Sequence, residues 1–151
     1  MELENEKKGE KNASLKLFIV LHLAFKSIDQ VAHKHIKEKE MSITEFGVLE
    51  LLYHKGKQTI NNLRQRVLVA SSSISYVVNE LEQDGYIEKQ KCTEDKRVTY
   101  IHLTDAGRKM MDSVFPEHQE VIEEIMSDLS DEEKHELTEM LKVIGKKAAN
   151  M

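Results

Sequence analysis

Hydrophobic residues recur at intervals of three and four along most of this chain, which is the pattern of amphipathic helices. The spacing predicts four helices, at about 14–41, 42–55, 59–67 and 71–85, then two strands at 87–92 and 98–103. Two further helices follow, at 104–129 and from 130 onward. Residues 1–13 are polar and aperiodic, and they predict a flexible tail.

Capping signals support these boundaries. Ser42 with Glu45, and Ser130 with Glu133, have the spacing of capping boxes, in which each side chain bonds the other residue's backbone N–H. Thr59 and Thr104 are expected to cap the third and fifth helices, and Gly85 to end the fourth in a left-handed turn. Pro116 is expected to bend the fifth helix.

This order of elements predicts a mainly α fold with a small β-wing. Residues 42–104 form a winged helix-turn-helix lobe, and 14–41 and 105–151 form dimerisation helices around it. The first helix is apolar almost all round in its N-terminal half, through Leu15, Leu17, Ile19, Val20 and Leu23. Such a helix is buried on several sides, and a symmetric homodimer buries it economically.

Composition excludes several classes of protein. The chain has 151 residues, 40% hydrophobic and 32% charged, with 6 Gly and 1 Pro, which is too few turn residues for a β-sandwich or barrel. The longest apolar stretch, Leu17 to Phe25, is interrupted by His22 and falls short of the roughly 20 residues of a membrane span. With no signal peptide pattern, we expect a cytoplasmic protein.

Basic and acidic residues are distributed unevenly along the chain, whose net charge is −5. From Lys55 to Arg97 there are eight basic and six acidic residues, whereas from Asp112 to Met140 there are eleven carboxylates and one lysine. The second region would be repelled by phosphate and should face away from a nucleic acid. Cys92 is the one cysteine, and the seven histidines show no chelating spacing, so no metal or cofactor is expected.

The fourth helix has the surface expected of a DNA recognition helix. Its apolar side chains fall on one side, and Ser72, Ser75, Tyr76 and Asn79 on the other, where short polar groups permit close approach to base edges. Its N-terminal serines, Ser71, Ser72 and Ser73, lie where backbone N–H groups suit phosphate. Taken alone, this pattern equally fits an ordinary amphipathic helix with a solvated face.

The expected hairpin tip, Asp95-Lys96-Arg97, strengthens the DNA-binding interpretation. An arginine on a narrow tip suits the minor groove, and Asp95, two residues earlier, is placed to orient its guanidinium bidentately. We expect phosphate contacts from Thr59, Asn61, Arg64 and Lys96.

Four blocks of sequence resemble the MarR family of winged-helix transcriptional regulators. They are Thr44 to Leu49, Ser75 to Gly85, Asp95 to Arg97, and Leu103 to Gly107, in this order and spacing. The resemblance implies an obligate homodimer formed by the first, fifth and sixth helices, with the fourth helix in the major groove. It also implies that a ligand pocket, where present, lies between the dimer helices and the DNA-binding lobe. Tyr76 departs from the pattern, because many relatives carry a basic or imidazole side chain there.

The segments Leu15 to Leu21 and Glu45 to Gly56 resemble the branch of the family that controls resistance to quinones and catechols. This resemblance implies a stress-response regulator with a flat aromatic effector. The candidate pocket residues are Phe18, His22, Phe25, Phe46, Tyr53, Met111 and Phe115, which equally fit a plain core and interface.

We therefore expect a homodimeric regulator rather than an enzyme, a repressor released from an inverted-repeat operator by a small phenol- or quinone-like effector. Two alternatives stay open. One is a constitutive or thiol-modified regulator, in which basic residues near Cys92 favour a reactive thiol and Glu94 and Asp95 oppose it. The other is a protein-interaction dimer that uses its acidic C-terminal half.

Overall fold

The computed structural model describes residues 2–67 and 73–151 of the chain. Within them lie six helices, α1 (Glu2–Glu38), α2 (Ile43–Lys55), α3 (Ile60–Arg66), α4 (Ile74–Gln83), α5 (Asp105–Ile125) and α6 (Asp131–Ala149). Three strands, β1 (Gln58–Thr59), β2 (Ile87–Lys91) and β3 (Thr99–Leu103), form an antiparallel sheet in the order β1-β3-β2. The mainly α fold with a small β-wing is therefore confirmed.

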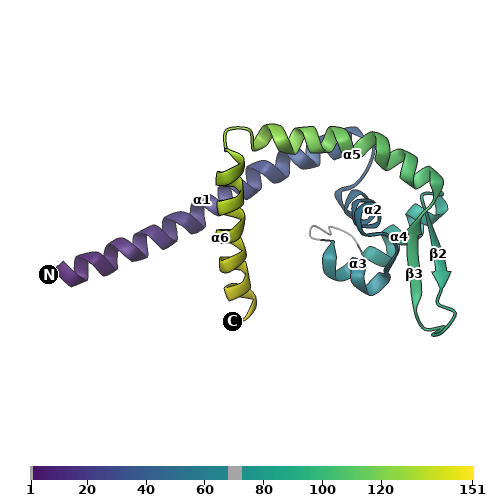
Figure 1. Cartoon of the computed structure of the whole chain (residues 1–151), viewed down its shortest axis with the longest axis horizontal. Coiled ribbons are helices and arrows are strands. Elements are labelled where there is room, and N and C mark those ends of the chain that lie inside the picture. The colour runs from purple at the N-terminus through teal and green to yellow at the C-terminus, as the bar shows by residue number, and fades with distance from the viewer. Residues whose placement is uncertain (1, 68–72) are drawn as a thin grey trace.

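The molecule has a compact lobe and a long helical arm (Figure 1). The lobe contains α2, α3, α4 and the sheet. Helix α5 leaves β3, passes over the lobe beside the C-terminal part of α1, and curves along its length, with Pro116 inside it. The N-terminal part of α1 extends away from the lobe, and in this view α6 runs across the direction of α1.

The core of the lobe joins all of its elements. Leu49 of α2, Leu63 of α3, Val78 of α4 and Ile101 of β3 are completely buried, and Met111 brings α5 into the same cluster. Burial of a leucine-sized side chain stabilises a fold by about 1.5–3 kcal/mol, so this shared core fixes α4 and the wing relative to α2.

The capping signals act as expected. In α2 and α6 both hydrogen bonds of the capping box are present, between Ser42 and Glu45 and between Ser130 and Glu133. Gly85 has a φ of 82° after α4. The Gly85 N–H donates to the Glu82 carbonyl and the Tyr86 N–H to the Leu81 carbonyl, which is the Schellman pattern that directs the chain into β2.

Several expected boundaries were wrong. Helix α1 begins at Glu2 rather than at Ser14, because the polar segment before Ser14 is rich in residues that favour helix even without an apolar period. Helix α4 begins at Ile74, with Ser73 in the cap position, and α5 ends at Ile125 instead of near residue 129. The short strand β1 was not expected; it pairs Gln58 with Ile101 and Thr59 with Tyr100.

Candidate nucleic-acid interface and pocket

Helix α4 separates its apolar and polar side chains cleanly. Ile74, Val77, Val78 and Leu81 are buried against the lobe. On the other side Tyr76 is 61% exposed, Asn79 is exposed, and Ser75 is half-buried. The expected Ser71 and Ser72 lie outside the described residues, and Ser73 is exposed at the helix start. Of the expected contact face, Ser75, Tyr76 and Asn79 are thus placed together on one side of a rigid helix.

Two of these polar side chains are held by cations from other elements. Arg64 of α3 donates from Nη2 to Ser75 Oγ at 2.7 Å. Lys89 of β2 donates from Nζ to Asn79 Oδ1 at 2.6 Å, and the same Nζ lies 2.8 Å from Glu82 Oε2. Sequence reasoning did not assign Lys89 to the interface, because its contact with Asn79 depends on how β2 packs beside α4.

The wing tip has the geometry that the Asp95/Arg97 spacing predicts. Arg97 Nε and Nη2 donate to the two carboxylate oxygens of Asp95 at 3.1 and 3.2 Å, and the Arg97 backbone N–H donates to Oδ1 at 3.0 Å. These side-chain and backbone donors lower the pKa of Asp95, so its carboxylate stays charged. The Arg97 side chain is nevertheless 91% exposed, so its direction is fixed while most of its surface stays free.

A polar groove runs between α3 and the wing. Its volume is about 530 Å³, and it is lined by Thr59, Asn61, Arg64 and Arg97, together with Ile60, Asn62, Gln65, Val98 and Thr99. Four residues that the sequence assigned to DNA contacts therefore share one surface. The Thr59 hydroxyl also caps α3 by accepting from the Asn62 N–H at 3.1 Å. Lys96 is exposed on the wing but does not line this groove.

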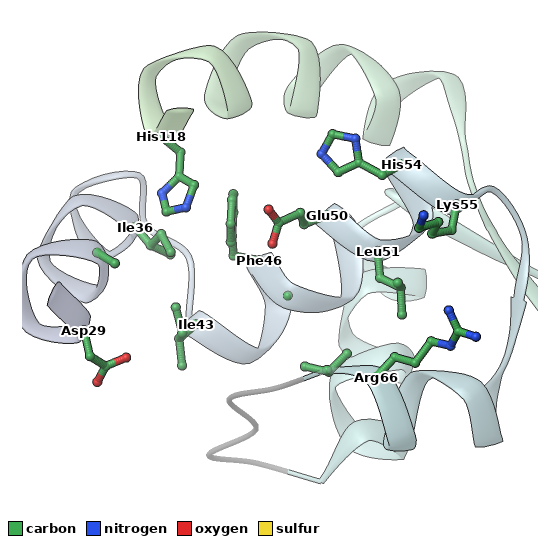
Figure 2. Close-up of a pocket in the computed structure, with 13 residues that line it drawn as sticks. Asp29, Ile36, Ile43, Phe46, Glu50, Leu51, His54, Lys55, Arg66 and His118 are labelled. Carbon is green, nitrogen blue, oxygen red and sulfur yellow. The ribbon is translucent and has the colours of Figure 1, made fainter. Parts of the chain in front are cut away.

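A separate, mostly apolar pocket of about 360 Å³ opens between α1, α2, α5 and the end of α3. Figure 2 shows Phe46 and Glu50 rising from α2, with His118 reaching down from α5. The remaining lining residues are Asp29, Ala32, Ile36, Ile43, Gly47, Leu51, His54, Lys55, Arg66 and Val67. The pocket thus contacts both the winged lobe and the helices expected to dimerise.

Burial shifts the pKa values of two polar side chains in this pocket. Burial raises the pKa of Glu50, and nearby His54 partly opposes this effect. Burial, and secondarily the charge of His35, lowers the pKa of His118, whose ring lies 4.6 Å from the Phe46 ring. His118 Nδ1 is buried without a hydrogen-bond partner in the described part of the chain. A neutral imidazole and a carboxyl group therefore sit beside an aromatic ring.

Of the residues that the sequence proposed for the pocket, one lines it in the structure and the others lie elsewhere. Phe46 lines the pocket, whereas Tyr53 and Phe115 pack with His54 in an aromatic cluster, where the Tyr53 hydroxyl donates to Asp112 at 2.6 Å. Met111 is buried in the core. Phe18, His22 and Phe25 are exposed on α1 and do not line the pocket. Glu50 and His118 were missed as pocket residues; a carboxylate between Leu49 and Leu51 on an otherwise apolar face was the available signal.

Two helix faces are strongly apolar and exposed in the single chain. On α1, Phe18 is 69% exposed and Leu15, Leu17, Ile19, Val20, Leu23 and Phe25 are each more than half exposed. On α6, Val143 is 71% exposed, and Leu137, Met140, Leu141 and Ile144 add to the surface. Contiguous apolar patches of this kind are typical of protein interfaces.

The described residues offer few other groups for a reactive or metal-binding site. The Cys92 thiol is free and half-buried beside the wing, where its backbone N–H donates to the Val98 carbonyl at 2.9 Å. Across residues 2–67 and 73–151, no group of three or more His, Cys, Asp or Glu side chains could hold a metal ion. No helix in the same ranges is both long and apolar enough to cross a bilayer.

Comparison with known proteins identifies the family to which this chain is related. A family model described as transcriptional regulator SarA/Rot matches residues 30–114. The HTH-type transcriptional regulator MhqR of Bacillus subtilis is 46% identical over 132 residues, covering 87% of this chain and 91% of that protein. The HTH-type transcriptional repressor YetL of the same organism is 30% identical over 130 residues, covering 85% of this chain and 78% of that protein.

Solved structures show the same fold. Sco3205, a MarR family transcriptional regulator from Streptomyces coelicolor crystallised in complex with DNA, is similar with a TM-score of 0.78 at 20% identity. The match covers 88% of this chain and 86% of that one.

Proposed function

The chain belongs to the MarR family of winged-helix, DNA-binding transcriptional regulators, and from that premise we propose that it is a homodimeric repressor of an inverted-repeat operator. The repressor assignment is supported by the similarity to YetL, which is described as a transcriptional repressor. The family consists of regulators rather than enzymes.

In this proposal α4 enters the major groove and the wing enters the adjacent minor groove. The observation that carries it is the Arg97 guanidinium, oriented by Asp95 and largely exposed, in the same groove as the α3 residues Asn61 and Arg64. A preoriented cation lowers the ordering cost of binding, and the minor groove concentrates negative potential. The carboxylate-rich region from Asp112 to Met140 lies on α5, α6 and the turn between them, and none of its residues lines this groove.

Dimerisation is supported by the exposed apolar faces of α1 and α6. A single chain would leave Phe18, Leu17 and Val143 in water, whereas a two-fold partner would cover the same faces on both copies. Two such lobes fit half-sites about 34 Å apart, one turn of the duplex. The acidic α5 and α6 would then lie away from the DNA.

The experiment for the DNA interface compares Arg97→Ala with Lys147→Ala, a matched loss of one positive charge at an exposed position of α6. With fluorescence anisotropy on a duplex carrying the upstream sequence of its own gene, Arg97→Ala should weaken binding about tenfold or more. It should also make the slope of log binding constant against log salt concentration shallower by about 0.9. Unchanged affinity of Arg97→Ala at fixed salt, or an equal loss for Lys147→Ala, would contradict the wing assignment.

We further propose that a small phenol- or quinone-like effector binds the pocket around Phe46 and releases the DNA. The volume of about 360 Å³ suits a small ligand, and the lining is mostly apolar, with Phe46 among its residues. A phenolic hydroxyl would donate to the Glu50 carboxylate, with the His118 side chain also lining the pocket. Because the pocket contacts α1 and α5 as well as α2 and α3, its occupant would favour a different spacing of the two lobes.

The effector experiment titrates a preformed DNA complex with phenol, catechol, hydroquinone, benzoate and peroxide. Glu50→Gln should raise the phenol concentration needed for release severalfold, because the amide is a weaker acceptor than a carboxylate. Glu38→Gln, at an exposed position outside the pocket, should leave it unchanged. Cys92→Ser should respond like the unmodified chain; loss of the response in Cys92→Ser would support thiol modification instead and overturn the pocket.

A further inference from the structure

The two cations that contact α4 determine which hydrogen-bonding groups the helix offers to DNA. Ser75 Oγ accepts from Arg64, which leaves the Ser75 O–H as a donor. Asn79 Oδ1 accepts from Lys89, which leaves the two N–H groups of Asn79 Nδ2 as donors. Ser75 in the first turn of α4 and Asn79 in the second therefore present donors outward, whereas a free asparagine would present a donor and an acceptor side by side.

Lys89 is held at this position by a second anchor. Its Nζ lies between Asn79 Oδ1 and Glu82 Oε2, and these two residues are three apart on the same face of α4. The ammonium group thus lies along the surface that faces DNA in the proposed complex. It also offsets the negative charge of Glu82, which would otherwise repel phosphate there.

From this arrangement we infer that Lys89, a residue of the wing strand β2, determines the base preference of the recognition helix by occupying the carbonyl oxygen of Asn79. This inference rests on the proposed function, in which α4 enters the major groove. Asparagine pairs bidentately with adenine by accepting from N6 and donating to N7. With Lys89 in place, the N6 amino group would have to share this oxygen with an ammonium whose positive charge repels the N6 hydrogens, so adenine is disfavoured.

The bases favoured instead are those that offer acceptors in the major groove. Guanine presents N7 and O6, and thymine presents O4. The Lys89 ammonium also keeps one N–H for an acceptor of the same kind, since two of its three donors are used by Asn79 and Glu82. Lys89 is thus a specificity-determining residue outside the recognition helix, and it acts through Asn79.

The test selects preferred sites from a pool of randomised duplexes with the full-length chain, its Lys89→Met and Asn79→Ala variants, and the control Lys91→Met. Lys91 is an exposed lysine on the same strand, two residues away. Met keeps the length and apolar stem of lysine and removes its donors. Thermal unfolding of each variant confirms folding, and Glu82→Gln, which removes the second anchor of Lys89, provides a milder perturbation of the same contact.

The unmodified chain should enrich guanine or thymine at one position per half-site, and Asn79→Ala should lose that preference. Lys89→Met should shift the same position toward adenine by about tenfold in relative affinity, the size of one bidentate base contact. Glu82→Gln should shift it in the same direction by less, and Lys91→Met should keep the original preference.

Three results would overturn the inference. One is an unchanged site preference in Lys89→Met with a uniform loss of affinity, which would make Lys89 a phosphate contact. A second is that the unmodified chain prefers adenine at the position whose base preference is lost in Asn79→Ala. The third is that Asn79→Ala keeps the site preference of the unmodified chain. Failure of the unmodified chain to enrich any sequence would be a different result, because it would reject the proposed DNA-binding function itself.

Discussion

Gly107 lies where α5 begins against the turn between α4 and β2, and replacing it with alanine should disturb the wing. A Cβ at this position would lie 2.1 Å from the Tyr86 carbonyl oxygen and 3.2 Å from Leu103 Cδ2. The first contact is with backbone, so it is not relieved by rotation of a side chain. Helix α5 must therefore move by about 1 Å relative to Tyr86 before the contact becomes tolerable.

That movement strains the hydrogen bonds that join α5 to the turn. The Thr104 N–H donates to the same Tyr86 oxygen at 3.1 Å, and the Thr104 hydroxyl donates to the Gly85 carbonyl at 2.6 Å. Overpacking of this kind costs about 1–3 kcal/mol, while alanine gains up to about 1 kcal/mol in helix propensity. We expect a net loss of about 1–2 kcal/mol in the free energy of unfolding.

Urea unfolding followed by circular dichroism, at one fixed protein concentration, measures this loss. The control is Ala106→Gly, the reverse change at the exposed neighbouring position, which should cost about 1 kcal/mol or less through propensity alone. Because Gly107→Ala also displaces the wing, it should weaken DNA binding at temperatures well below its unfolding midpoint, whereas Ala106→Gly should not. A Gly107→Ala chain as stable as the unmodified chain, with full affinity, would refute the reasoning.

Other predictions address the core, the pocket and the dimer. Leu49→Ala removes a completely buried side chain and should lower the free energy of unfolding by about 2–5 kcal/mol in the same urea assay. Burial lowers the pKa of His118 below its ordinary 6.5, so the unfolded chain takes up more protons and stability should fall as pH drops below about 6.5. His118→Gln should flatten that part of the stability profile between pH 7.5 and 5.5, and an unchanged slope would contradict this account. Phe18→Glu should shift the chain toward monomer in size-exclusion chromatography, and an unchanged elution volume would argue against α1 as the dimer surface.

Features set by short-range sequence signals were predictable. The capping boxes at Ser42 and Ser130, the left-handed turn at Gly85, and the Asp95–Arg97 pair each depend on residues within a few positions of one another. Their geometry follows from local hydrogen bonding, so spacing alone is sufficient to identify them.

Features that depend on packing between distant elements were not predictable. Glu50 and His118 are 68 positions apart and meet in one pocket only because α5 crosses α2. Lys89 reaches Asn79 through the placement of β2 beside α4, and the two-residue strand β1 is defined by its pairing with β3. The α1 boundary was missed because periodicity reports the buried face of a helix, and the first residues of α1 have no such apolar pattern.

The central claim is that two copies of the chain join through α1, α5 and α6 and place two α4 helices and two wings on one duplex. Sedimentation velocity at micromolar concentration, with the chain alone and with a duplex carrying its inverted repeat, tests it most directly. The account predicts a dimer in the absence of DNA and two chains per duplex in the complex. A single sedimenting subunit in the absence of DNA, or one chain per duplex, would contradict it.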